Sequence, residues 1–237
     1  MPTQQQLPSS RFFLILTLLF GLLWFGQLDY RKLVKPDEGR YAEISREMAV
    51  SGDWVTPRLN GLKYFEKPPM QYWATAAAYK AFGLNEWTAR LWTGLTGFAG
   101  ILLAAFAAYR LYGRETGLLT GVVLGGCFYQ LALGHINTLD MGVSFFLELA
   151  LVGFLLAHRD QAGKTENRNW MMITWAAMAG AMLSKGLIGL VLPGAALVLY
   201  VLLTQQWRLL ANMHWGKGLL LFGVLTAPWF VLVSQRN

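Results

Sequence analysis

The stretch RFFLILTLLFGLLWFGQL, residues 11–28, carries a single charge, at its first residue. A helix that crosses the roughly 30 Å hydrocarbon core of a bilayer needs about 20 mostly apolar residues. No small-residue cleavage site of the kind that ends a secretory signal peptide follows the stretch. It is therefore predicted to remain in the chain as a first membrane span.

The composition of the whole chain agrees with a membrane protein. Among its 237 residues, 55% are hydrophobic and 14% are charged, and the mean hydropathy is +0.38. The net charge of +7 is not gathered into a basic stripe or an arginine-rich arm. Membrane lipid is therefore expected as a partner, and nucleic acid is not.

Seven apolar segments are candidate spans, so the chain is predicted to be an all-α membrane protein, a polytopic bundle of about seven transmembrane helices. The fifth and sixth segments are short and are separated only by Ser184, Lys185 and Gly186, which predicts a tight hairpin or a pair of broken helices. The segments are 11–28, 89–109, 116–134, 141–158, 170–184, 186–203 and 216–234.

The short connections predict the orientation, because Lys and Arg are enriched in cytoplasmic connections. One set of segment ends collects most of these cations, so it is expected to face the cytoplasm. The long connection 29–88, which holds eight of the thirteen acidic residues, then lies on the outer face of the membrane. The cations of the first set are Arg11, Arg110, Arg114, Arg159, Lys164, Arg168, Arg208 and Lys217.

Two short amphipathic helices are predicted to lie at the membrane surface within this long connection. The first follows Pro36 and ends near Gly52, and the second follows the Pro68-Pro69 pair. The apolar face of the first is predicted to carry Tyr41, Ile44 and Met48, and that of the second Met70, Trp73, Ala77 and Phe82.

Two aspartates are candidates for catalysis. Asp37 falls in the first turn of the helix after Pro36, where the helix dipole and Arg40, three residues on, favour the ionised carboxylate. Asp140 falls in HINTLDMG, residues 135–142, where the third segment returns to the outer face; a charge there is costly unless it is solvated or paired. For either residue, capping of a helix is the alternative interpretation.

Cations on the same face are candidates for holding a phosphate group. Lys67 is a compact charge beside Glu66 and a rigid Pro-Pro pair, and Arg58 could join it. A surface salt bridge between Glu66 and Lys67 is the alternative. Lys185, isolated between two apolar segments, either neutralises a lipid phosphate or extends its amine to the headgroups.

Metal-ligand spacing is lacking among the histidines, since His135, His158 and His214 are scattered along the chain. The sequence specifies no cofactor and leaves a divalent metal ion open. A carboxylate that orients or activates an acceptor, with cations that hold a leaving phosphate, would suit an enzyme that takes a sugar from a lipid phosphate.

The segment PDEGRYAEISREMAVSGDWVTPRLNGLKYFEKPPMQYW, residues 36–73, closely resembles the first outer loop of the bacterial 4-amino-4-deoxy-L-arabinose lipid A transferases and related protein O-mannosyltransferase-like glycosyltransferases. The similarity also includes NTLDMG (137–142), LSKGLIGLVLPG (183–194) and APWFVLVSQRN (227–237). It implies a GT-C fold with an outward-facing site at the membrane surface. Such an enzyme takes a sugar from a polyprenyl (undecaprenyl) phosphate and inverts its anomeric centre.

Roles for individual residues follow from the resemblance by position. Asp37 is implied to be the essential carboxylate of the first loop and Asp140 the second acidic residue of the site. The implied acceptor is lipid A or another component of the cell envelope. Arg40 and Lys67 are implied to hold the donor phosphate, and Tyr41, Tyr64 and Glu66 to line the pocket.

The resemblance also implies more membrane spans than this chain contains. It further implies a C-terminal periplasmic domain, which these 237 residues do not include. Residues 1–237 are therefore expected to be the N-terminal part of a GT-C domain, with 29–88 as its periplasmic loop. Three alternatives stay open. One is a protein O-mannosyltransferase-like enzyme, one is a fragment without activity, and one is a lipid transporter, suggested by the short helices around Lys185.

Overall fold

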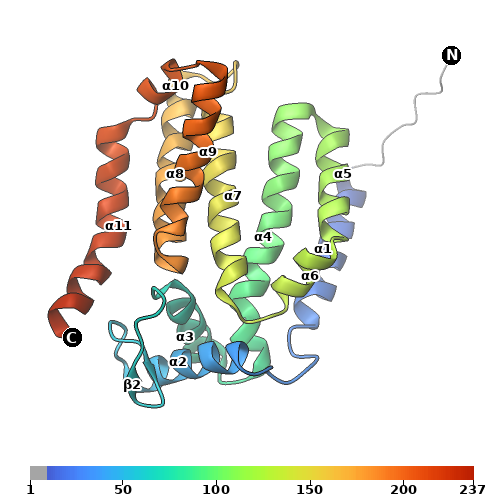
Figure 1. Ribbon diagram of the computed structural model, residues 1–237. Coiled ribbons are helices and arrows are strands. Elements are labelled where there is room, and N and C mark those ends of the chain that lie inside the picture. The colour runs from blue at the N-terminus through green and yellow to red at the C-terminus, as the bar shows by residue number, and fades with distance from the viewer. Residues whose placement is uncertain (1–9) are drawn as a thin grey trace.

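The structure is a computed structural model that describes residues 10–237, so the first nine residues of the predicted 1–237 domain lie outside it. Within the described residues the chain forms eleven helices and one two-stranded antiparallel hairpin (Figure 1). Most of the helices stand side by side as a bundle; α2 and α3 lie across one of its ends, and the short α10 lies at the other.

The upright helices follow the predicted apolar segments closely. In the described part of the chain, α4, α7 and α11 are long and apolar enough to cross a membrane, and α5 with α6 adds a fourth if this bent pair is one span. The all-α membrane class is confirmed. The bounds are α1 (Ser10–Gly26), α4 (Glu86–Tyr112), α5 (Arg114–Gly125), α6 (Phe128–Gly134), α7 (Leu139–Ala157), α8 (Lys164–Lys185), α9 (Ile188–Thr204) and α11 (Trp215–Arg236), with the single turn α10 (Arg208–Ala211) before α11.

The third predicted segment, 116–134, is wrong as a single straight helix. The helices α5 and α6 are bent by 63° relative to one another. The break falls at Gly125-Gly126, where two residues without side chains weaken the helix, and Cys127 then adopts an extended conformation. As a result α6 leads the chain into the connection before α7.

The connection between α1 and α4 covers one end of the bundle. It contains α2 (Asp37–Ser51), the hairpin of β1 (Arg58–Leu59) with β2 (Leu62–Lys63), and α3 (Met70–Phe82) (Figure 1). Its first helix buries Tyr41, Ile44 and Met48, as predicted.

The helix α3 packs between α2 and α4 by residues other than the four apolar ones predicted along it. Its buried residues include Tyr72, Ala76 and Tyr79, whereas Phe82 is exposed. Trp73 is half-buried against the hairpin loop, where its indole donates a hydrogen bond to the Trp54 carbonyl at 2.7 Å.

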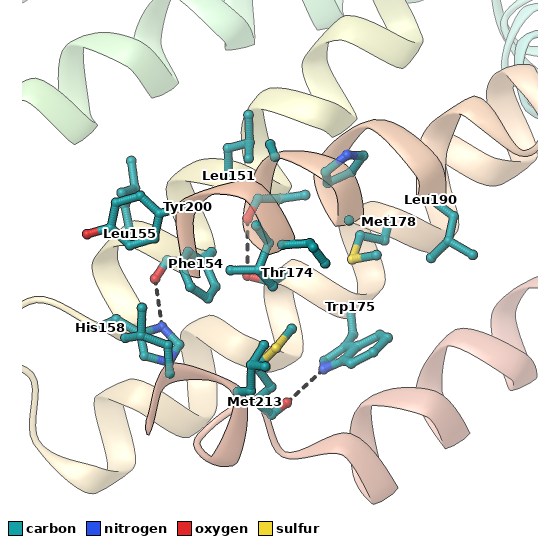
Figure 2. Close-up of a pocket in the computed structure, with 18 of the residues that line it drawn as sticks. Leu151, Phe154, Leu155, His158, Thr174, Trp175, Met178, Leu190, Tyr200 and Met213 are labelled. Carbon is teal, nitrogen blue, oxygen red and sulfur yellow. Dashed lines mark hydrogen bonds between the residues drawn. The ribbon is translucent and has the colours of Figure 1, made fainter. Parts of the chain in front are cut away.

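The opposite end of the bundle gathers the cations that the sequence assigns to one side of the membrane. It is formed by the C-terminal ends of α4, α7 and α9, the start of α8, and α10 (Figure 1). Near this end, α7, α8, α9 and the connection to α11 enclose an apolar pocket (Figure 2). The tight hairpin predicted at Ser184–Gly186 is confirmed at the other end, where α8 stops and α9 begins.

Candidate active site

Asp140 and Lys185 form an ion pair at the end of the bundle that α2 and α3 cover. Asp140 lies in the first turn of α7, and Lys185 is the last residue of α8. The helix ends there because Gly186 has a φ of 81°, a left-handed conformation that favours glycine. Both side chains keep access to ligands, since Asp140 is 47% and Lys185 32% exposed. Thr138, not Asp140, occupies the N-cap position of α7.

A second charged group surrounds the start of α2. Asp37 is 55% exposed, and its carboxylate lies 3.6 Å from the Arg40 guanidinium. Pro36 occupies the N-cap position of α2, so Asp37 does not cap this helix. The nearby Tyr64 hydroxyl raises the pKa of the Arg40 guanidinium, so the group extends from α2 to the loop before α3.

The loop before α3 continues this group. The Tyr64 hydroxyl donates a hydrogen bond to Glu66 Oε2 at 2.6 Å, and Glu66 Oε1 lies 3.2 Å from Lys67 Nζ. The predicted Glu66–Lys67 salt bridge therefore exists, but it belongs to a larger chain of contacts rather than standing alone. Five predicted residues, Asp37, Arg40, Tyr64, Glu66 and Lys67, form this one polar group.

Tyr41 forms part of the apolar floor beneath these charges. Its ring centroid lies 6.2 Å from that of Tyr72, and both rings are buried. Burial, together with the negative charge of Asp37, raises the pKa of Tyr41 to about 12. The phenol therefore stays neutral and able to donate a hydrogen bond at physiological pH.

The two charged groups adjoin one another through their neighbours in the sequence. Leu139, which precedes Asp140, packs in the same buried cluster as Tyr41 and Tyr72. A methyl group on Gly186, which follows Lys185, would come within 4.0 Å of Pro68 Cγ, and Pro68 follows Lys67. Asp37, Lys67, Asp140 and Lys185 thus lie at the same end of the bundle, and the surface that they form is called the rim below.

Arg58 has its ion-pair partner outside the group of Asp37 and Lys67, and its role beside Lys67 stays a prediction. Its guanidinium lies 3.9 Å from the carboxylate of Asp53, and Arg236 at the end of α11 lies 3.6 Å from the same carboxylate. The β1–β2 hairpin carries Arg58 toward the C-terminal end of α11, which is why the two predicted cations separate.

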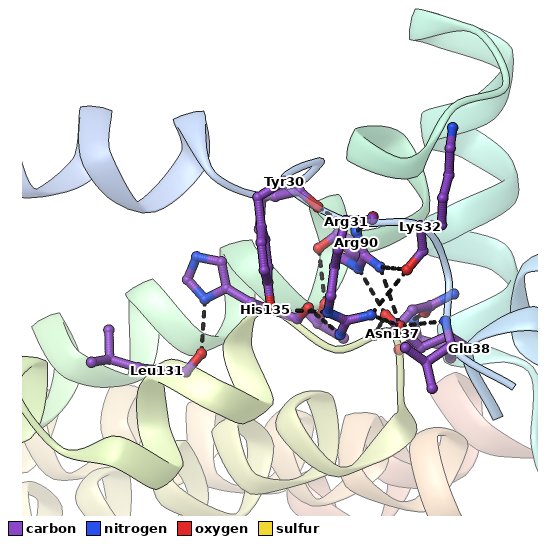
Figure 3. A network of polar contacts seen from close by, with 12 residues as sticks. Tyr30, Arg31, Lys32, Glu38, Arg90, Leu131, His135 and Asn137 are labelled. Carbon is purple, nitrogen blue, oxygen red and sulfur yellow. Dashed lines mark hydrogen bonds and ion pairs between the residues drawn. The ribbon is translucent and has the colours of Figure 1, made fainter.

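A buried ion-pair network that the sequence does not predict fixes α2 to the bundle (Figure 3). Glu38 Oε1 lies 2.7 Å from Arg90 Nε, with the two side chains 2% and 0% exposed. Glu38 also accepts hydrogen bonds from Arg31 and from the backbone N–H groups of Val34 and Asn137. Burial tends to raise the pKa of Glu38, but these hydrogen bonds outweigh it and hold the pKa at about 2.

This network positions both catalytic candidates. Asp37 directly precedes Glu38, and the Asn137 N–H that Glu38 holds at 2.8 Å lies three residues before Asp140. The only sequence signal for the network is that Arg90 is a charge at the start of an apolar segment.

Buried polar atoms without partners lie beside the rim. Gln71 donates a hydrogen bond to Asn137 at 2.7 Å, yet each amide keeps one unsatisfied atom. Among the described residues, the hydroxyls of Tyr72 and Thr138 also lack partners. Unsatisfied buried groups are rare, and those near a charged rim are candidates for contacts with a ligand.

Within residues 10–237, no three His, Cys, Asp or Glu side chains lie close enough together to hold a metal ion. His135 at the rim is engaged elsewhere, because its ring nitrogens contact the carbonyls of Leu131 and Trp24 at 2.8 and 3.0 Å.

Fold and site together define a polytopic helical membrane protein with paired carboxylates and cations at one end of its bundle. The chain belongs to the dolichyl-phosphate-mannose-protein mannosyltransferase family, whose sequence model matches residues 9–237.

Solved structures and curated relatives agree with this assignment. ArnT from Cupriavidus metallidurans, in the apo state and bound to undecaprenyl phosphate, superposes with a TM-score of 0.94 in each case at 45% identity. The match covers 97% of this chain and 43% and 42% of those two chains.

Two curated relatives are named undecaprenyl phosphate-alpha-4-amino-4-deoxy-L-arabinose arabinosyl transferase. The protein of Erwinia tasmaniensis is 33% identical over 96% of this chain and 41% of its own length. That of Proteus mirabilis, which carries the number 1 in its name, is 36% identical over 96% of this chain and 42% of its own length. The chain therefore spans about two fifths of the relatives that it matches.

Proposed function

We propose that this chain forms part of a membrane glycosyltransferase that moves 4-amino-4-deoxy-L-arabinose from undecaprenyl phosphate to lipid A or another cell-envelope acceptor. The names of the similar proteins support the donor and the sugar. One observation supports the location of the site. The Asp140–Lys185 pair lies next to the Asp37–Arg40 group on one rim of the bundle.

The proposed reaction is a single displacement. An acceptor oxygen attacks the anomeric carbon from one face, a new C–O bond forms, and the bond from that carbon to the phosphate oxygen breaks on the other face. The electron pair of the broken bond leaves with undecaprenyl phosphate, so the anomeric centre is inverted. When the acceptor is an ionised phosphate no proton has to be removed, and Asp37 orients the acceptor or the sugar amine.

The cations of the rim stabilise the leaving group in this proposal. Lys67 and Lys185 are compact charges, and Arg40 adds a planar fork of N–H donors that suits phosphate oxygens. Their carboxylate partners keep them in place before the donor binds. The neutral Tyr41 hydroxyl supplies a donor beside them, and the Tyr64 hydroxyl holds Glu66 next to Lys67.

The proposed location is the periplasmic face of a bacterial inner membrane. Support comes from the charge distribution, since the eight cations of the short connections gather at the end of the bundle opposite the rim. Lys and Arg in short connections favour the cytoplasm, so the rim then opens to the periplasm.

The test is sugar transfer in membranes that contain the chain. Membranes receive undecaprenyl phosphate carrying isotope-labelled 4-amino-4-deoxy-L-arabinose together with lipid A, and mass spectrometry follows the label. Parallel arms offer a polyprenyl-phosphate mannose with an acceptor peptide, and a chelator. Label on lipid A that disappears in Asp37→Asn supports the proposal.

A matched control lies on the same helix. Glu43 forms an exposed pair with Arg46 at 2.7 Å, so Glu43→Gln alters the charge of α2 without touching the rim. Undiminished transfer by Asp37→Asn, or equal losses in the two variants, would refute the catalytic assignment. Mannosylated peptide in place of modified lipid A would favour the mannosyltransferase alternative.

A further inference from the structure

The apolar pocket at the α10 end of the bundle has a volume of about 640 Å³ (Figure 2). This volume is within the range of about 300–1,000 Å³ that small-molecule sites occupy. Its walls come from α7, α8, α9, α10 and the start of α11, and most of the lining side chains are aliphatic or aromatic. A ligand that fits must therefore bury apolar surface.

The polar side chains that line the pocket are mostly satisfied by the protein itself. The Thr174 hydroxyl donates to the Trp170 carbonyl at 3.0 Å, and the Trp175 indole donates to the Met213 carbonyl at 2.9 Å. His158 Nδ1 contacts the Phe154 carbonyl at 3.0 Å, whereas its Nε2 is buried and has no partner in the described structure. Among the buried side-chain atoms of the described lining, His158 Nε2 thus remains for a ligand, at the C-terminal end of α7.

The pocket is separate from the charged rim. Asp140 and His158 lie at opposite ends of α7, and the 18 helical steps between them span about 27 Å, close to the thickness of the hydrocarbon core. A lipid whose phosphate is held at Lys67 and Lys185 therefore has its headgroup at the other membrane surface.

The mouth of the pocket has the chemistry of an interface with anionic lipid. Exposed Trp207 and Trp215 flank it, as tryptophans do at the headgroup level. Exposed Arg208 directly precedes the lining residue Leu209, exposed Lys217 lies two residues from each of the lining residues Trp215 and Leu219, and residues 205–237 contain no Asp or Glu to neutralise them. Of the carboxylates that follow His158 in the chain, Glu166 is already paired with Arg110 and Arg159, and Asp160 is exposed to solvent.

We infer that this pocket binds one acyl chain of an anionic phospholipid from the leaflet at the α10 end, with the headgroup phosphate between Arg208 and Lys217. Juxtamembrane cations attract anionic headgroups, and the apolar walls replace neighbouring lipid tails. A headgroup hydroxyl of phosphatidylglycerol would donate a hydrogen bond to His158 Nε2, which has no partner among the described residues. The site is distinct from the proposed transfer site.

Photo-crosslinking tests the occupant directly. The chain is reconstituted in phosphatidylethanolamine vesicles with a trace of phosphatidylglycerol that carries a diazirine near the end of one acyl chain. After irradiation, peptide mass spectrometry is expected to find the label on α8, α9 and the α10 connection. An excess of phosphatidylglycerol should compete, and phosphatidylcholine or undecaprenyl phosphate should not.

Two glycine variants distinguish the pocket from the general lipid-facing surface. Gly194 lines the pocket and Gly223 does not, and a Cβ at either position would meet no atom within 4 Å. Gly194→Leu fills the cavity, so labelling of the pocket peptides should fall by at least about half, whereas Gly223→Leu should leave it unchanged. Circular dichroism and gel filtration of both variants check that they fold.

Charge variants test the headgroup. Removing one cation near a membrane surface weakens anionic lipid binding roughly fivefold, so Arg208→Gln and Lys217→Gln should each reduce labelling at limiting lipid by about that factor. Arg11→Gln, on α1 at the far side of the bundle, should not.

Three results would overturn the inference. One is equal labelling of wild type and Gly194→Leu, and another is competition by undecaprenyl phosphate, which would assign the pocket to the tail of the donor. The third is crosslinking of a photoreactive side chain at position 194 to polypeptide instead of lipid. Failure of sugar transfer would not produce any of these, because the two sites are tested by different readouts.

Discussion

Glu38 and Arg90, 52 residues apart in the sequence, form a buried ion pair that fastens α2 to the start of α4. Arg90 also donates hydrogen bonds to the carbonyls of Leu28, Arg31 and Lys32, so a single guanidinium holds the end of the connection from α1. Because Asp37 directly precedes Glu38 in the chain and the Asn137 N–H donates to the Glu38 carboxylate, the geometry of the rim depends on this pair.

Replacing Glu38 by Gln is expected to destabilise the fold strongly. The change leaves the Arg90 charge buried without its partner, which typically costs about 3–5 kcal/mol. Glu43→Gln removes an exposed pair on the same helix, which is worth about 1 kcal/mol or less. Denaturant unfolding of the detergent-solubilised chain, followed by tryptophan fluorescence, measures both. Similar unfolding free energies for the two variants would contradict the role of the network.

The same carboxylate predicts an acid-sensitive component of stability. The pKa of Glu38 is about 2 in the folded chain, below its ordinary value of 4.5, so the ionised form stabilises the fold at pH values above 4.5. This contribution, roughly 3 kcal/mol, should be lost as the pH falls from about 4.5 to about 2. Unfolding curves between pH 7 and pH 2.5 should show wild type losing its advantage over Glu38→Gln. A constant difference between the two proteins across this window would argue against the assignment.

Much of the bundle could be predicted from the sequence, because apolar length is a local property. The helix after Pro36 and its buried face of Tyr41, Ile44 and Met48 also follow from local spacing. The face of α3 does not, since the tyrosines that it buries carry polar hydroxyls and its partners on both sides, α2 and α4, are set by tertiary packing. The bend between α5 and α6 is hidden inside one continuous apolar run.

The site was predictable where residues are close in sequence or matched by resemblance. Asp37 with Arg40 and Glu66 with Lys67 are local pairs, and the structure contains both. The partnership of Asp140 with Lys185 joins two helices 45 residues apart, so the sequence names the residues but not the pair. The pairing of Arg58 with Asp53 could not be predicted, because the direction of a two-residue hairpin depends on what it packs against.

Separating the roles of Asp140 and Lys185 requires a binding measurement. Lys185→Gln removes a cation from the proposed phosphate site, so binding of undecaprenyl phosphate should weaken roughly fivefold. Asp140→Asn removes a carboxylate that competes for that lysine, and it should leave the affinity unchanged or improve it while abolishing sugar transfer. Arg58→Gln, away from the rim, should change neither property. Fluorescence quenching or microscale thermophoresis with the purified chain gives the affinities, and weaker binding by Asp140→Asn would contradict the proposed division of roles.

The contact between Gly218 and Trp175 predicts a strict size limit at the start of α11. A Cβ at position 218 would lie 2.0 Å from Trp175 Nε1, and this indole also holds the Met213 carbonyl at 2.9 Å. Gly218→Ala must therefore displace the indole or α11, which should cost about 1–3 kcal/mol. Gly216 lies on the same helix with nothing within 4 Å of its Cβ position, so Gly216→Ala should be neutral or should stabilise the helix by up to about 1 kcal/mol. Apparent unfolding temperatures in detergent should drop for the first variant only, and equal temperatures for both would show that α11 does not pack on Trp175 in this way.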